Sequence, residues 1–184
     1  MTSEELGRHA ERLLAAHALA DADPAPLAGL LARCTERRLA TGQPLFQEGD
    51  PAAEVSFLLE GRVSVLKKDP AGSDRQIGAW FAPAVVGGLA AVEGARRSAS
   101  CIAGAPSVVA SLSAADAREV LADPGPAGAE LRFILLSAFT EALANTTSHL
   151  RELLSEYASD RGISGAPSPQ AGSGAGTSTE GSDS

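Results

Sequence analysis

The sequence has little cysteine, few aromatic residues and no long hydrophobic run. Its 2 cysteines, Cys34 and Cys101, are too few for a disulfide framework, a zinc site or a ferredoxin-type cluster. No apolar segment approaches the roughly 20 residues that span a bilayer, and the N-terminus lacks the basic and apolar stretches of a signal peptide. Aromatic residues make up only 4% of the chain, so a core must consist mainly of Leu, Val and Ala. We therefore expect a soluble, cytoplasmic protein without membrane insertion.

Basic residues are scarce as well, because 15 Lys and Arg stand against 23 Asp and Glu, for a formal net charge of -8. Proteins that bind a nucleic-acid backbone usually carry a net basic face, so we expect no DNA binding.

Catalytic patterns are missing too. His9, His17 and His149 have no cysteine or carboxylate at metal or triad spacing, and we interpret them as surface residues or residues of a helical seam. Gly87-Gly88 lacks the Lys-Ser/Thr of a P-loop. We therefore expect neither an enzyme nor a metal site.

Residues 1–30 are predicted to form a helical segment, because apolar Leu6, Leu13, Leu14 and Leu19 share one stripe with charged residues beside it. Asp23-Pro24-Ala25-Pro26 is predicted to break this pattern, and a second short helix is predicted for Leu27–Thr35. At the other end, residues 159–184 are mostly Ser, Gly, Ala, Pro and Thr. Such a composition cannot offset its own ordering entropy, so we predict a disordered tail.

Between these ends, residues 31–126 predict a β domain. Short apolar runs such as 55–59 and 63–65 alternate with Gly- and Pro-containing turns about every 8–12 residues, which is typical of an antiparallel sandwich or barrel. Ser113, followed by Asp116, predicts the N-cap of a short helix. The predicted fold class is α+β, mainly β.

A long helix is predicted for residues 127–158. Apolar residues and one threonine follow one another along it at intervals of three and four, which gives an a/d seam of three heptads: Leu136, Phe139, Leu143, Thr146, Leu150, Leu153 and Tyr157. The second half of this seam extends past any core that so short a chain can supply. It therefore predicts a parallel homodimer, and the alternative is a helix folded back onto its own domain.

Two segments, Gly42–Asp50 and Phe57–Val65, resemble the first half of a cyclic nucleotide-binding domain, with its Gly-Asp hairpin and its apolar strand closed by Gly-x-Val. A third, Val86–Ala99, is similar to the phosphate-binding cassette of that family. The resemblance covers about residues 27–157. It implies an antiparallel β-roll (a double-stranded β-helix or jelly roll) flanked by N-terminal helices and a long C-terminal dimerisation helix.

The cassette resemblance implies which residues contact the ligand. Backbone groups at Gly87 and Gly88, together with Arg97, Ser98 and Ala99, correspond to the family's phosphate-binding residues. The family's ribose-binding Glu is replaced here by Gly88, so Gly88→Glu is expected to strengthen binding of the ribose ligand.

On the long helix, Thr146 and Thr147 stand where bacterial regulators resembling the catabolite activator contact the base. The alternative is that a seam threonine only sets helix register.

These features together suggest a stand-alone regulatory or sensor module. The sequence has no segment resembling the winged helix-turn-helix that DNA-binding members carry after the long helix. The expected ligand is a cyclic nucleotide (cAMP or cGMP), bound weakly or with altered selectivity. The alternative is a degenerate, ligand-free scaffold that dimerises and binds a protein partner.

Overall fold

The computed structural model describes residues 1–160. The predicted tail therefore lies outside the described residues except for Ser159 and Asp160, which belong to the last helix. The chain divides into two compact units, residues 1–143 and 144–184, and each is described by itself. No helix within the described residues is both long and apolar enough to cross a membrane.

Two helices open the chain. Helix α1 (Ser3–Ala16) starts with a capping box, in which the Glu5 amide donates to Thr2 Oγ1 at 3.2 Å and the Thr2 amide donates to the Glu5 carboxylate at 2.6 Å. Helix α2 spans Pro24–Ala32 and is capped by Asp23. The prediction that Pro24 lies in a break before the helix was wrong, because proline fits the first turn, where an amide has no helical acceptor.

His17 closes α1 and is only 4% exposed, so its interpretation as a surface or seam residue was wrong. Its amide donates to the carbonyls of Leu13 and Leu14, and the next residue, Ala18, has a left-handed φ of 58°. The chain therefore reverses there and leaves the imidazole inside.

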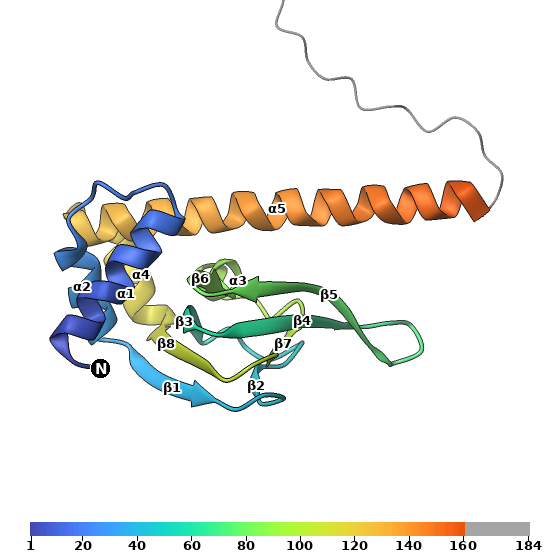
Figure 1. Ribbon diagram of the computed structural model, residues 1–184, viewed down its shortest axis with the longest axis horizontal. Helices are drawn as coiled ribbons and strands as arrows, with labels where there is room; N and C mark the ends of the chain where they lie inside the picture. The colour runs from blue at the N-terminus through green and yellow to red at the C-terminus, as the bar shows by residue number, and fades with distance from the viewer. Residues whose placement is uncertain (161–184) are drawn as a thin grey trace, which may run out of the picture. The chain divides into compact units, whose positions relative to one another are not determined.

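After these two helices, the described residues form eight strands in two four-stranded antiparallel sheets (Figure 1). One sheet has the order β1-β8-β3-β6 and the other β2-β7-β4-β5. The strands are β1 (Thr35–Leu39), β2 (Pro44–Phe46), β3 (Glu54–Glu60), β4 (Arg62–Lys68), β5 (Asp74–Phe81), β6 (Ala84–Val86), β7 (Ser100–Ala103) and β8 (Ser107–Ser113). This arrangement confirms the predicted mainly β roll with flanking helices.

The first sheet is buried on both faces. In β3, Leu58 packs between the sheets, whereas Phe57 and Leu59 point to the other side. That outer side is covered by α1, α2, α4 (Ala114–Ala122) and the first half of α5 (Pro126–Asp160). Because successive strand residues face opposite sides, five consecutive residues of β3 are buried. The helices α1, α2 and α4 gather at one end of the sheets (Figure 1).

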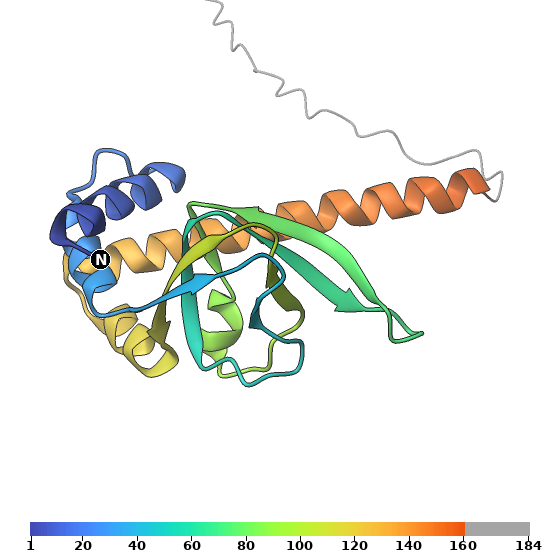
Figure 2. The same cartoon turned by 60° about the horizontal axis from the view of Figure 1, so that its bottom comes forward.

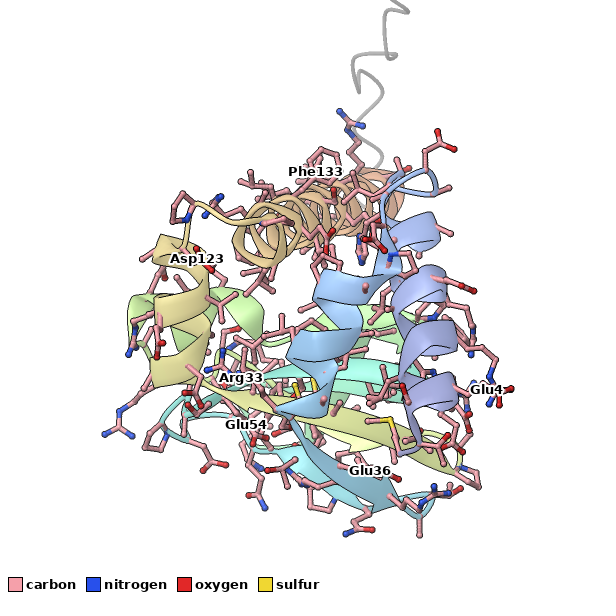
Figure 3. The ribbon with its side chains drawn as sticks, turned by 90° about the vertical axis from the view of Figure 1, so that its left-hand side faces the viewer. Glu4, Arg33, Glu36, Glu54, Asp123 and Phe133 are labelled. Carbon is pink, nitrogen blue, oxygen red and sulfur yellow. The ribbon has the colours of Figure 1, made fainter. Side chains whose placement is uncertain are left out.

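The boundaries of α4 and α5, which follow the last strand, lie close to the predicted ones. Ser113 caps α4, because its Oγ accepts from the Asp116 amide at 3.0 Å. Helix α5 starts one residue before the predicted range and continues to Asp160. Figure 3 looks along α5 and shows Phe133, which is 43% exposed, on the side of this helix remote from the sheets.

Candidate functional site

The Gly-Asp hairpin and the cassette, far apart in the sequence, lie side by side. The Gly49 amide donates to the Arg97 carbonyl at 2.9 Å, and the Arg97 amide donates to the Asp50 carbonyl at 2.9 Å. Arg96 adds a side-chain bond from Nη1 to the Gly49 carbonyl at 2.8 Å. Two of the three motifs that carry the family resemblance are thus joined by hydrogen bonds.

A short helix, α3 (Gly88–Glu93), opens the cassette and packs against β3 and α4 (Figure 2). It begins after Gly87, which has a left-handed φ of 71°, a conformation that favours glycine. A Cβ atom at Gly87 would also collide with Nη1 of Arg97. Gly87 therefore serves both the turn and the close approach of Arg97.

Arg97 is the most buried cation of the described residues, with 3% of its surface exposed. Nη1 donates to the Gly87 carbonyl at 2.7 Å and Nη2 donates to the Glu54 carbonyl at 2.7 Å. The guanidinium carbon lies 3.9 Å from the centroid of the Phe46 ring. Burial lowers the pKa of Arg97, and the negative charge of Glu54 opposes this shift. Its Nε is buried and has no acceptor among the described residues.

Glu54 connects two arginines at the start of β3. Its carbonyl accepts from Arg97, while its carboxylate forms an ion pair with Nη1 of Arg37 at 3.0 Å. The Glu54 side chain, labelled in Figure 3, is therefore paired with Arg37. Arg97 is held chiefly by backbone oxygens.

Ser98 and Ala99 differ in exposure. Ser98 is exposed, and its carbonyl accepts from Lys67 Nζ at 2.7 Å; Ala99 is 8% exposed. Lys67 also forms an ion pair with Glu48 at 2.8 Å. Hydrogen bonds from Lys67 and from the Lys68 amide hold the pKa of the Glu48 carboxyl below its usual value. Strand β4 therefore adds a cation beside the cassette.

Gly88 is buried in the apolar core. A Cβ atom on it would lie 2.7 Å from Cδ2 of Leu135 and 3.5 Å from Cγ1 of Val85. A side chain at this position would therefore start toward α5 and the core. Gly88→Glu was expected to restore a ribose-binding carboxylate by itself, but Leu135 would have to move to make room for it.

The predicted base contacts and part of the seam lie in the second unit. Thr147 is exposed, and the side chains of Thr146, Leu150 and Leu153 lie outside the described residues. Their predicted roles in base binding and dimerisation stay predictions. Of the other seam residues, Phe139 packs partly against the core of its own domain, whereas three are exposed by 52–70%: Leu136, Leu143 and Tyr157.

Sequence reasoning did not assign roles to four residues that shape the site. Phe46 lies in the Gly42–Asp50 motif, but nothing in the residue pattern indicates its contact with Arg97. Glu54 acts through its carbonyl, which any residue would supply. Lys67 and Leu135 approach the cassette from β4 and α5, and such tertiary contacts have no local sequence signature. No group of three or more His, Cys, Asp or Glu in the described part of the chain could hold a metal ion.

Comparisons with known proteins agree with this geometry. The model of the cyclic nucleotide-binding domain family matches residues 36–123. A cyclic nucleotide-binding domain from Methylobacillus flagellatus KT is 25% identical, with a TM-score of 0.68, and the match covers 82% of this chain and 85% of that one. The N-terminal domain of a transcriptional regulator from Streptomyces coelicolor A3(2) is 26% identical, with a TM-score of 0.54 and coverages of 74% and 89%.

The catabolite activator protein of Thermus thermophilus shares the fold at 20% identity and a TM-score of 0.60. The match covers 72% of this chain but only 60% of that protein. No curated protein sequence matches the chain. Residues 36–123 therefore match the cyclic nucleotide-binding domain family, and the fold of the chain is similar to that of a cyclic nucleotide-binding domain.

Proposed function

We propose that the protein is a non-catalytic regulatory or sensor module that binds a cyclic nucleotide, cAMP or cGMP, mainly through its phosphate. The observation that best supports this function is the burial and bonding of the Arg97 guanidinium. Its guanidinium is buried, fixed by two carbonyls and stacked on Phe46, yet its Nε has no acceptor among the described residues. A buried donor without a partner is costly, and a phosphate oxygen is a strong acceptor for it.

The surroundings of Arg97 favour an anion. Gly87 brings the start of α3 against the guanidinium, and the first amides of a helix lack acceptors within the helix. Exposed Ser98 offers a hydroxyl next in sequence. Together these groups match the chemistry of a phosphate monoanion, with Arg97 supplying charge and Ser98 a neutral hydrogen bond.

Binding is weak or altered in selectivity because position 88 supplies no carboxylate. A charge-assisted hydrogen bond contributes about 1.5–3 kcal/mol, so its loss weakens binding by roughly ten- to a hundredfold. For the same reason the ligand's 2′-hydroxyl should matter little. The base is proposed to contact Thr146 and Thr147.

Calorimetric titration of the full chain with cyclic AMP, cyclic GMP and 2′-deoxy cyclic AMP tests this function. We expect measurable binding, with the ribose and deoxyribose forms of cyclic AMP bound similarly. Arg97→Lys should abolish it, because lysine lacks the forked donors. Arg96→Lys is the matched control, since Arg96 is an exposed cassette arginine whose side chain, among the described residues, donates only to the Gly49 carbonyl. A wild type that binds none of the three ligands at millimolar concentration would overturn the proposal.

The second candidate is a ligand-free scaffold that binds a protein partner. Two observations favour it: the terminal nitrogens of Arg97 already have carbonyl partners, and Leu135 lies where a side chain at Gly88 would go. A null titration together with a folded, dimeric protein supports this scaffold.

We propose further that the module acts as a cytoplasmic homodimer through α5 and does not bind DNA. Leu136 and Tyr157 support this assembly, because both are large apolar or aromatic seam residues that are 63% and 52% exposed in a single chain. The formal net charge of -8 argues against a nucleic-acid partner.

A further inference from the structure

Gly88 and Leu135 form a close contact between the cassette and α5. Gly88 is the first residue of α3 and is buried, and Leu135 on α5 is only 3% exposed. The position that a Cβ atom would take on Gly88 lies 2.7 Å from Leu135 Cδ2, closer than real Cβ atoms approach a neighbour. Leu135 therefore fills the space that the missing side chain leaves.

This contact lies one residue from the peptide that holds Arg97. The Gly87 carbonyl accepts from Arg97 Nη1, and Gly88 follows it directly. Val55 and Val85 surround the same point, with Cγ1 atoms 3.8 and 3.5 Å from that Cβ position. Apolar packing from α5 thus reaches the turn that positions the arginine.

We infer that the Gly88–Leu135 contact fixes the first half of α5 to the cassette without any ligand, so that the two elements move as one body. Protein cores are close-packed, and a gap of less than an ångström already loses much of the dispersion energy. Movement of α5 away from α3 would therefore open a cavity at Gly88. This coupling goes beyond the proposed nucleotide binding, because only residues of the chain take part.

The coupling has a consequence for assembly. Leu136 follows Leu135 on α5 and points outward, with 63% of its surface exposed. When Leu135 is held by Gly88, the orientation of Leu136 on this helix is held as well. The exposed side of the first half of α5 is therefore presented in the same way with and without ligand.

The first test compares two glycine-to-alanine variants of the full chain by urea denaturation, without nucleotide. Gly88→Ala should shift the unfolding midpoint to lower urea, because the new methyl meets Leu135. Gly29→Ala is the matched control: Gly29 is also helical, has nothing within 4 Å of its Cβ position, and should be as stable as wild type or more so. Adding Leu135→Ala to Gly88→Ala should cost less than Leu135→Ala costs in wild type.

The second test measures hydrogen exchange of the α3 amides, again without nucleotide, relative to β8 amides of the same variant. Leu135→Ala should raise α3 exchange by about tenfold or more. Leu131→Ala, which removes an equally buried leucine of α5 that is not among the three nearest neighbours of Gly88, should raise it much less. Equal α3 exchange in both leucine variants, or a Gly88→Ala variant as stable as Gly29→Ala, would overturn the inference. Neither result depends on whether a nucleotide binds.

Discussion

Arg97 stacks on Phe46 of β2, with the guanidinium carbon 3.9 Å from the ring centroid, and so connects the cassette to this strand. The same guanidinium donates to carbonyls of β3 and of the turn before α3. Arg97 therefore has a structural role that does not require a ligand. Variants at this position need a stability measurement before any binding result is interpreted.

Arg97→Ala should destabilise the free protein by about 1–3 kcal/mol, because it leaves two partly buried carbonyls without their donors. Arg96→Ala should cost less than about 1 kcal/mol, since the hydrogen bond from its side chain to the Gly49 carbonyl is exposed to water. Urea denaturation of both variants without nucleotide checks this. An Arg97→Ala protein as stable as wild type would mean that the two carbonyls find other donors.

Gly88→Glu should destabilise the protein and leave cyclic AMP binding no stronger than in wild type. The introduced carboxylate starts against Leu135 in an apolar environment, so overpacking and desolvation both oppose it. We expect the free energy of unfolding to fall by at least about 1 kcal/mol. Gly29→Glu is the control, because nothing lies within 4 Å of the Cβ position of Gly29 on α2. Denaturation and calorimetry measure the two effects. Tighter binding of the ribose ligand alone would show instead that Leu135 yields and that the carboxylate reaches the ribose.

The contrast between β3 and position 88 shows what the sequence can predict. The run of apolar residues in β3 and the spaced turns predicted an antiparallel sandwich or barrel, because strand patterns and turn chemistry are local properties. The β-roll and the cassette were predicted from the resemblance of three short motifs to a known family. In contrast, the space for a side chain at Gly88 depends on Leu135, which is distant in sequence and approaches only after α5 packs. The burial of His17 was missed for a similar reason, because it depends on tertiary packing at the end of α1 and not on a local pattern.

Stability should depend on pH through His17. Burial lowers the pKa of this imidazole below its usual value, and the charge of Glu141 opposes the shift. Between the folded pKa and the unfolded value of about 6.5 the unfolded chain binds more protons, so stability falls as pH decreases through this window.

Glu130 contributes with the opposite sign. Burial raises the pKa of its carboxyl, so its contribution to the stability of the fold decreases as pH rises above about 4.5.

Denaturation of wild type and His17→Leu at pH 7 and pH 5 isolates the effect of the histidine. The variant should lose less stability at pH 5 than wild type does, and an equal loss would exclude His17 as the source.

Both thiols should react slowly in the folded protein. Burial raises the pKa of Cys34 and of Cys101 from 9.0 to about 12, and Cys101 is only 3% exposed. A rise of three units means about a thousandfold less thiolate, the reactive form. Titration with a chromophoric thiol reagent at pH 8 should show little reaction until denaturant is added, and Cys34→Ser assigns the two phases. Rapid modification of native Cys101 would contradict its burial.

Leu136→Glu should convert the proposed dimer into a monomer without loss of folding. Leu136 is 63% exposed in a single chain, so the new carboxylate remains in water when the chains are separate. In a parallel helix pair the a/d seam brings equivalent residues together, and two carboxylates would then be buried beside each other. Ala144→Glu is the control, because Ala144 is exposed on the same helix and directly follows the seam residue Leu143, so it lies at neither an a nor a d position. Light scattering over a range of concentrations should give a monomer mass for Leu136→Glu and a dimer mass for wild type and Ala144→Glu. A wild type that is monomeric at every concentration would show that α5 is not a dimerisation helix. The exposed seam residues would then be available to a different protein partner.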